Sequence, residues 1–177
     1  MQTEQNLPSL SGAVIWLIPS DADAARFHKE IDRLSDRFKT PPFLPHLTLG
    51  RLTNKYSNTD FITPLKSITS VSGDNYYAFF DSVTCTESPY QNLIVSLKTS
   101  EKLEQLQSDI DDLIPGYTPK KEYHISLMYG DISCGDLQDE IKSLPEIFPE
   151  KICFSKMSTV QLNGKPGTWR TVWEQYI

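Results

Sequence analysis

The chain contains the segment Phe43-Leu44-Pro45-His46-Leu47-Thr48-Leu49-Gly50 and repeats its pattern at Glu122-Tyr123-His124-Ile125-Ser126-Leu127-Met128-Tyr129-Gly130. Each copy has a histidine, an aliphatic residue, a hydroxyl residue and a leucine in succession, with a glycine soon after. Successive side chains of a strand point to opposite faces, so His46 would share a face with Thr48, and His124 with Ser126. One His-x-Thr is common and carries little meaning. Its duplication in matching aliphatic frames predicts a site that uses two imidazoles and two hydroxyl groups.

Length and composition are those of an ordinary globular chain. A length of 177 residues suits one domain, expected over 1–177, or two small lobes that share a core. The net charge of −6 argues against sequence-independent binding to long nucleic acids, which relies on many Lys and Arg contacts to phosphate. A small anionic ligand in a local pocket is compatible with this charge. We expect a monomer.

The termini and the cysteines suggest a compartment. Residues 1–11 are polar, are expected to be flexible and lack the pattern of a secretory signal. No apolar run approaches the roughly 18 residues of a membrane span, so we expect no membrane partner. The three cysteines, Cys85, Cys134 and Cys153, form no Cys-x-x-Cys pair and indicate neither a zinc site nor a disulfide framework, although one disulfide among them is compatible with the spacing. The simplest inference is a reducing, cytoplasmic setting.

Hydrophobic periodicity predicts a repeated order of elements. Strand, helix and motif strand recur in each half, which is an internal duplication in outline. Pro45 removes a donor for strand pairing and fits best at the start or edge of the first motif strand. Strands are expected over 12–18, 43–52, 76–86, 90–97, 123–129, 152–162 and 169–176, and helices after Ser20 (with Asp23 in a capping box), over 60–68, after Ser100 and over 137–144.

The paired motifs have a chemistry of their own. Two histidines on opposite sides of a bound group can divide general base and general acid work, because their ordinary pKa near 6.5 allows either protonation state. Thr48 and Ser126 can donate hydrogen bonds to oxygens that carry negative charge. A phosphodiester fits this set best. No acidic cluster or further suitably placed histidine accompanies the pair, so the residues predict phosphodiester cleavage without a metal or another cofactor.

His46-Leu47-Thr48-Leu49 and His124-Ile125-Ser126-Leu127 resemble the two His-x-Thr/Ser motifs of the 2H phosphoesterase superfamily. The chain is most similar to its small cyclic phosphodiesterases, in the opening strand with Trp16 and Pro19, the Phe-x-Pro-His lead-in and the ending on Tyr129. The resemblance implies an α+β, bilobal, duplicated fold. Two antiparallel sheets would surround a central cleft, with helices on the outer faces.

The resemblance also implies an activity. The expected reaction is hydrolysis of 2′,3′-cyclic nucleotides, or of ADP-ribose 1″,2″-cyclic phosphate, to the 2′- or 1″-phosphate without metal. Thr48 and Ser126 would bind the phosphate, His124 would be the base and His46 the acid. Tyr129 would reach the cleft only if its strand ends or bulges near Met128.

Other aromatic and basic residues have two interpretations each. Tyr90 could stack on a base or pack in the core. Trp16 and Trp169 are expected in the core. The pair Lys120-Lys121, just before the second motif, is expected in a solvated loop, with steering of a phosphate as the alternative.

Three alternatives accompany this prediction. The first is an RNA-end or 2′-5′ oligonucleotide phosphodiesterase of the same superfamily, which would act on RNA ends through an extended groove. The second is a non-catalytic nucleotide-binding module, although such a module has no need for all four motif side chains. The third is a structural or interaction protein. The pathway, whether clearance of a tRNA-splicing by-product or general RNA turnover, stays open.

Overall fold

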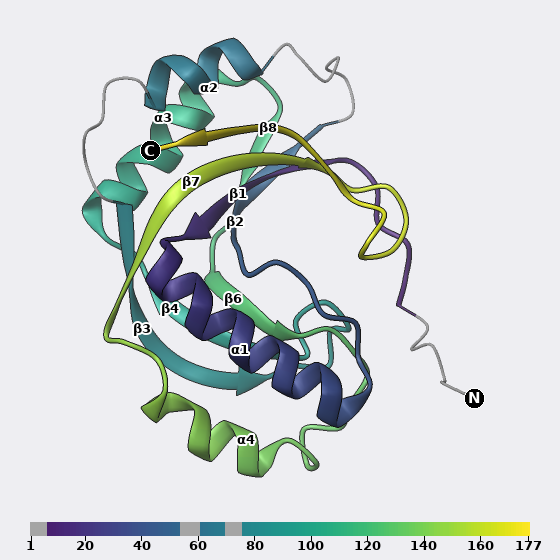
Figure 1. Ribbon diagram of the computed structural model, residues 1–177. Helices are drawn as coiled ribbons and strands as arrows, with labels where there is room; N and C mark the ends of the chain where they lie inside the picture. Colours follow the sequence, from purple (N-terminus) through teal and green to yellow (C-terminus); the bar gives the residue numbers. More distant parts are fainter. Residues whose placement is uncertain (1–6, 54–60, 70–75) are drawn as a thin grey trace.

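The computed structural model describes residues 7–53, 61–69 and 76–177. Figure 1 shows a strongly curved sheet with helices packed against it. The elements in chain order are β1 (Ala13–Pro19), α1 (Asp21–Phe38), β2 (Leu47–Leu52), α2 (Ile62–Thr69), β3 (Tyr76–Cys85), β4 (Leu93–Lys98), α3 (Glu101–Leu113), β5 (Tyr117–Pro119), β6 (Tyr123–Met128), α4 (Gln138–Ser143), a short 3₁₀ turn (Leu144–Glu146), β7 (Lys151–Gln161) and β8 (Arg170–Tyr176).

The eight strands form one antiparallel sheet, not the two separate sheets that the sequence led us to expect. Their order is β1-β2-β6-β4-β3-β7-β8, β5 pairs with β2, and a further pairing of β1 with β7 closes the sheet on itself. The sheet is continuous because β7 is long: its first residues pair with β3 and its later residues with β1. The two expected lobes are therefore two parts of one sheet.

The two parts meet a second time between the motif strands. Only Leu47 of β2 and Ile125 of β6 form a pair, and the strands diverge on either side of it. Both residues are fully buried, as are Leu49 and Leu127. The aliphatic residues of both motifs therefore face the main hydrophobic core, and the histidines and hydroxyl residues alternate with them.

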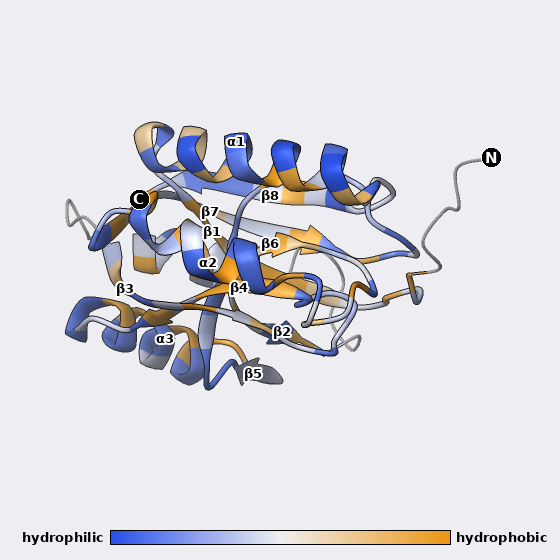
Figure 2. Cartoon of the chain, turned by 90° about the horizontal axis from the view of Figure 1, so that it is seen from below, coloured by the Kyte–Doolittle hydropathy of each residue, from blue (hydrophilic) through white to orange (hydrophobic). Residues whose placement is uncertain are grey.

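The helices cover the sheet from different sides. In Figure 2, α1 and α3 lie on opposite sides of the strands. Phe27, Ile31 and Leu34 of α1 are buried in the core, as the spacing of its apolar residues predicted. The predicted capping box does not form, because Asp23 Oδ2 accepts a hydrogen bond from the Cys153 amide of β7 at 2.9 Å. The carboxylate attaches the helix to the sheet instead of capping it.

Several predicted boundaries differ from the structure. The strand predicted from residue 90 begins at Leu93, and Tyr90 lies in the preceding turn. β5 was predicted as loop. The loop predicted at 54–58 and the first residue of the helix predicted over 60–68 lie outside the described residues. So do residues 1–6 of the N-terminal segment, whereas Leu7 is buried and Leu10 pairs with Gly164.

Cys85 and Cys134 form a disulfide, and Cys153 is free. This pairing removes the argument for a reducing compartment, which rested on few and dispersed cysteines. Asn92 reinforces the connection: its side chain bonds the carbonyl oxygens of Thr86 and Ile132 and the Ile132 amide. Within the described part of the chain, no helix has the length and apolar character needed to cross a membrane.

Candidate active site

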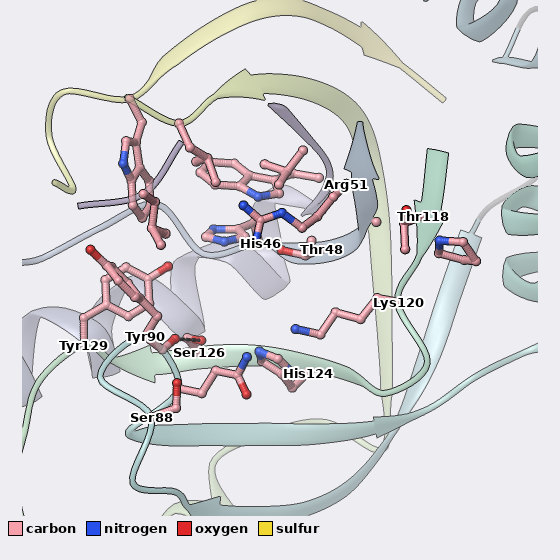
Figure 3. Close-up of a pocket in the computed structure, with 18 residues that line it drawn as sticks. His46, Thr48, Arg51, Ser88, Tyr90, Thr118, Lys120, His124, Ser126 and Tyr129 are labelled. Carbon is pink, nitrogen blue, oxygen red and sulfur yellow. Dashed lines mark hydrogen bonds between the residues drawn. The ribbon is translucent and has the colours of Figure 1, made fainter. Parts of the chain in front are cut away.

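The motif side chains converge because of the single pair between β2 and β6. Antiparallel pairing of Leu47 with Ile125 places His46 and Thr48 on one side and His124 and Ser126 on the other. Figure 3 shows these four side chains directed into the space between the diverging strands. The sequence-predicted quartet is thus brought together, and it lines one cavity.

This cavity has a volume of about 410 Å³. Its wall combines the motif residues with basic and polar side chains on one side and aromatic and aliphatic side chains on the other. The lining includes the following motif, basic and aromatic residues: His46, Thr48, Arg51, Tyr90, Lys120, His124, Ser126, Tyr129, Trp16 and Trp169.

His46 is held in a fixed orientation. Its Nδ1–H donates to the Leu44 carbonyl oxygen at 2.7 Å, so Nε2 is the nitrogen that can gain or lose a proton. The Trp16 ring stacks on the imidazole with ring centroids 3.6 Å apart. Burial lowers the pKa of His46 to about 4, the Leu44 carbonyl opposes this shift, and the charge of Lys120 adds to it.

The pKa of His124 is lowered in a similar way. Burial lowers its pKa to about 3, and the nearby charges of Lys120 and His46 lower it further. Among the described residues, no carbonyl accepts a hydrogen bond from His124 as the Leu44 carbonyl does from His46. Of the two histidines, His46 is therefore the one that is protonated first. An anion bound between the two rings would raise both pKa values, because it stabilises the charged imidazolium.

The two hydroxyl groups differ in their present partners. Ser126 Oγ donates to the Tyr90 carbonyl oxygen at 3.0 Å. Thr48 makes no side-chain hydrogen bond to any residue that the structure describes, and its strand position is opposite Trp16 of β1. The Thr48 hydroxyl is thus available to a ligand, and the Ser126 hydroxyl becomes available when its bond to Tyr90 is exchanged.

Tyr129 lines the cavity, as expected if its strand ends or bulges near Met128. β6 ends at Met128, and its pairing with β4 skips one residue between Ser126 and Met128. This bulge turns Tyr129 toward the cavity. Its ring stacks on Phe43 at 3.6 Å between centroids, and burial raises the pKa of its phenol.

Tyr90 and the two tryptophans form an aromatic end of the cavity. Tyr90 lies edge-on to Tyr129, and its hydroxyl donates to the Pro8 carbonyl. Trp169 contacts both tyrosine rings and also Trp16. The tryptophans were expected in the core. Trp16 is buried in a smaller core cluster with β1 and β7 residues, Trp169 is partly buried against that cluster, and both also line the cavity.

Sequence reasoning gave Lys120 a role toward phosphate only as its second interpretation, and it did not name Arg51. Lys120 was assigned to a solvated loop, but β5 pairs with β2 and carries it to the cavity. One signal was present in the sequence: Lys120 lies four positions before His124, an even separation that favours the same face of an extended segment. Among the described residues, no three His, Cys, Asp or Glu side chains gather as a metal site would require.

Solved structures share this arrangement of strands. A crystal structure of a phosphoesterase superposes with a TM-score of 0.56 at 12% identity, over 95% of this chain and 99% of the other. E. coli LigT complexed with 3′-AMP gives a TM-score of 0.52 at 12% identity, over 94% of this chain and 98% of LigT. The chain has the 2H phosphoesterase fold. No protein-family model matches the sequence, and no curated protein does.

The 2H phosphoesterase fold accounts for the duplicated pattern. Each part of the sheet contributes one motif strand, and the two strands touch only at their buried aliphatic residues. A histidine and a hydroxyl from each part then face each other across the cavity, which neither part could form alone.

Proposed function

We propose that this protein is a metal-independent cyclic phosphodiesterase. Its substrates would be 2′,3′-cyclic nucleotides, ADP-ribose 1″,2″-cyclic phosphate, or both, and its products the 2′- or 1″-phosphates. The observation that carries the proposal is the convergence of His46, Thr48, His124 and Ser126 on one cavity. Two imidazoles and two hydroxyls around one space can supply the acid, the base and the phosphate contacts for in-line hydrolysis of a phosphodiester.

The mechanism follows from the unequal environments of the histidines. Binding of the anionic phosphate raises both pKa values, and the Leu44 carbonyl favours protonation of His46 at Nε2. His124, still neutral, removes a proton from water as the water oxygen bonds to phosphorus. The ring P–O bond breaks, and His46 gives its proton to the departing oxygen. The extra proton on His124 then returns through solvent, which restores the starting state.

The rest of the cavity suits a nucleotide. Thr48 and Ser126 would hold the non-bridging phosphate oxygens, and the aromatic end with Tyr90 and Tyr129 would contact the base. A volume of about 410 Å³ falls in the range of small-ligand pockets, about 300–1,000 Å³. LigT, of the same fold, has been crystallised with 3′-AMP, which supports a nucleotide as the ligand here.

The direct test is incubation of the purified protein with each 2′,3′-cyclic nucleotide in EDTA, followed by phosphorus NMR. We expect a 2′-phosphate as the product. A 3′-phosphate would contradict the proposed regiochemistry, and activity that EDTA abolishes would contradict independence from metal. Binding of the cyclic nucleotide without turnover would favour the non-catalytic binding module.

A second candidate is an RNA-end or 2′-5′ oligonucleotide phosphodiesterase. It is favoured by a polar groove of about 750 Å³ over β3, β4 and β6, which shares Gln91, Lys120 and His124 with the cavity. A longer substrate could extend from the phosphate into this groove. To separate the two candidate functions, kcat/KM of this protein is measured for a cyclic mononucleotide and for a 2′-5′ oligonucleotide. The substrate with the larger kcat/KM identifies the substrate class.

A further inference from the structure

Lys120 directs a positive charge into the space between the two motif strands. Figure 3 shows its side chain extending toward the gap between His46 and His124. The residue lines both the cavity and the adjoining groove, and it is half-buried. It forms no ion pair with any residue in the described part of the chain.

Backbone hydrogen bonds hold Lys120 in this position. Among the described residues, its side chain makes no hydrogen bond or ion pair of its own. Its amide donates to the Leu49 carbonyl of β2 at 2.8 Å. The Lys120 carbonyl oxygen accepts a hydrogen bond from the side-chain Nε2 of Gln107 at 2.9 Å. Gln107 Nε2 also donates to the Leu49 carbonyl oxygen at 2.9 Å. The Tyr123 hydroxyl in turn donates to Gln107 Oε1. The ammonium group is thus carried by an anchored backbone.

The charges around Lys120 leave its own charge uncompensated. Burial lowers the pKa of Lys120, Arg51 lowers it further, and Glu122 opposes the shift without forming an ion pair. His46 and His124, which line the cavity with it, offer no negative charge, and burial and Lys120 lower the pKa of each. A partly buried cation is costly unless an anion accompanies it, so the charge of Lys120 suits the cavity to an anionic ligand.

We propose that Lys120 is a third catalytic residue, whose ammonium binds a non-bridging phosphate oxygen and stabilises the charge that grows there as water adds. This inference rests on the proposed phosphodiesterase function for its role in turnover. The binding of a phosphate anion by Lys120 does not depend on that function, because it is argued from the position of the side chain in the cavity. The anion also cancels the field that Lys120 exerts on the histidines, so ligand binding and protonation of His46 are coupled.

The test compares Lys120→Met with Lys29→Met. The two variants remove the same charge, but Lys29 is exposed on α1 and lines neither the cavity nor the groove. We expect kcat/KM for the cyclic nucleotide to fall by about 10²–10³ in Lys120→Met, as for loss of one preorganised oxyanion donor. Lys29→Met should stay within about twofold of wild type, and Lys120→Arg should lose less than Lys120→Met.

A second readout does not depend on turnover. Histidine NMR during titration with inorganic phosphate reports both phosphate affinity and the state of His46 and His124. Lys120→Met should weaken phosphate binding by more than tenfold and raise the pKa of both free imidazoles, because the cation that lowers them is gone. A lysine that does not bind the anion would leave the phosphate affinity in place.

The outcomes separate this inference from the proposed function. If wild type lacks hydrolase activity but Lys120 still governs phosphate affinity, the proposed function fails and the anion site stands. If Lys120→Met matches wild type within about threefold in both turnover and phosphate affinity, the inference on Lys120 is wrong. Circular dichroism checks the fold. If Lys120→Met does not fold, Lys120→Gln replaces it, and wild-type behaviour of Lys120→Gln overturns the inference equally.

Discussion

The imidazoles of the site are tuned by what surrounds them, not by acidic partners. His46 is 8% exposed, stacked on Trp16 and fixed by the Leu44 carbonyl. Burial and Lys120 depress the pKa of both histidines. A site of this kind is inactive as a proton donor until an anion enters, because only the anion makes the imidazolium stable.

This account predicts the titration of the free protein. Burial disfavours the charged imidazolium, so His46 and His124 should stay neutral at pH 6 and titrate near their pKa values of about 4 and 3. Their contribution to stability is complete above the unfolded value near 6.5 and is lost as pH falls toward the folded values. Saturating phosphate should raise both pKa values. Histidine NMR measures these shifts, and ordinary titration near 6.5 in the free protein would contradict the account.

The two hydroxyls should both matter, with one difference. Thr48→Val and Ser126→Ala should each lower kcat/KM by about 10²–10³ if they act as oxyanion donors. Ser126→Ala should also lower the free energy of unfolding by about 0.5–1.5 kcal/mol, because Ser126 is bonded to the Tyr90 carbonyl and Thr48 has no such bond to a described residue. Kinetics and urea unfolding give both numbers. Rate losses below tenfold would assign the hydroxyls to structure.

At the scale of elements, the sequence predicted what depends on periodicity. The motif strands, α1, α3 and the long strand β7 each carry apolar residues at regular spacing, and all were predicted within a few residues. β5 escaped prediction because it is three residues long, too short for a hydrophobic period, so its pairing with β2 depends on tertiary structure. The position of Lys120 beside the cavity escaped prediction with it. The four motif residues could be predicted because each histidine lies only two positions before its hydroxyl residue in the sequence.

Gly50 makes the pairing of β5 with β2 possible. A methyl group at this position would lie 2.5 Å from the Thr118 carbonyl oxygen and 2.5 Å from the Tyr117 ring. Gly50→Ala should therefore displace β5, cost about 1–3 kcal/mol of stability and lower activity through the misplaced Lys120. Gly135→Ala, whose nearest contact is 3.6 Å, is the matched control. Equal stability and activity of the two variants would show that β5 need not lie this close.

At the scale of the whole molecule, one sheet presents two related half-sites. β7 joins the two parts at one end, and the single Leu47–Ile125 pair joins them beside the cavity. The expectation of two separate sheets failed because the path of β7 depends on its bend, which periodicity does not reveal. The disulfide between Cys85 and Cys134 and the side chain of Asn92 hold the Tyr90 turn against the segment that follows β6.

The central claim is that each part of the sheet supplies one essential histidine. Single-turnover hydrolysis of a 2′,3′-cyclic nucleotide by wild type, His46→Ala and His124→Ala tests it, with His28→Ala, on α1 and away from the cavity, as the control. Both site variants should lose at least about 10²–10⁴ in rate, the usual contribution of one acid or base, and keep the wild-type fold. His28→Ala should match wild type. Undiminished turnover in either His46→Ala or His124→Ala would contradict the two-histidine mechanism.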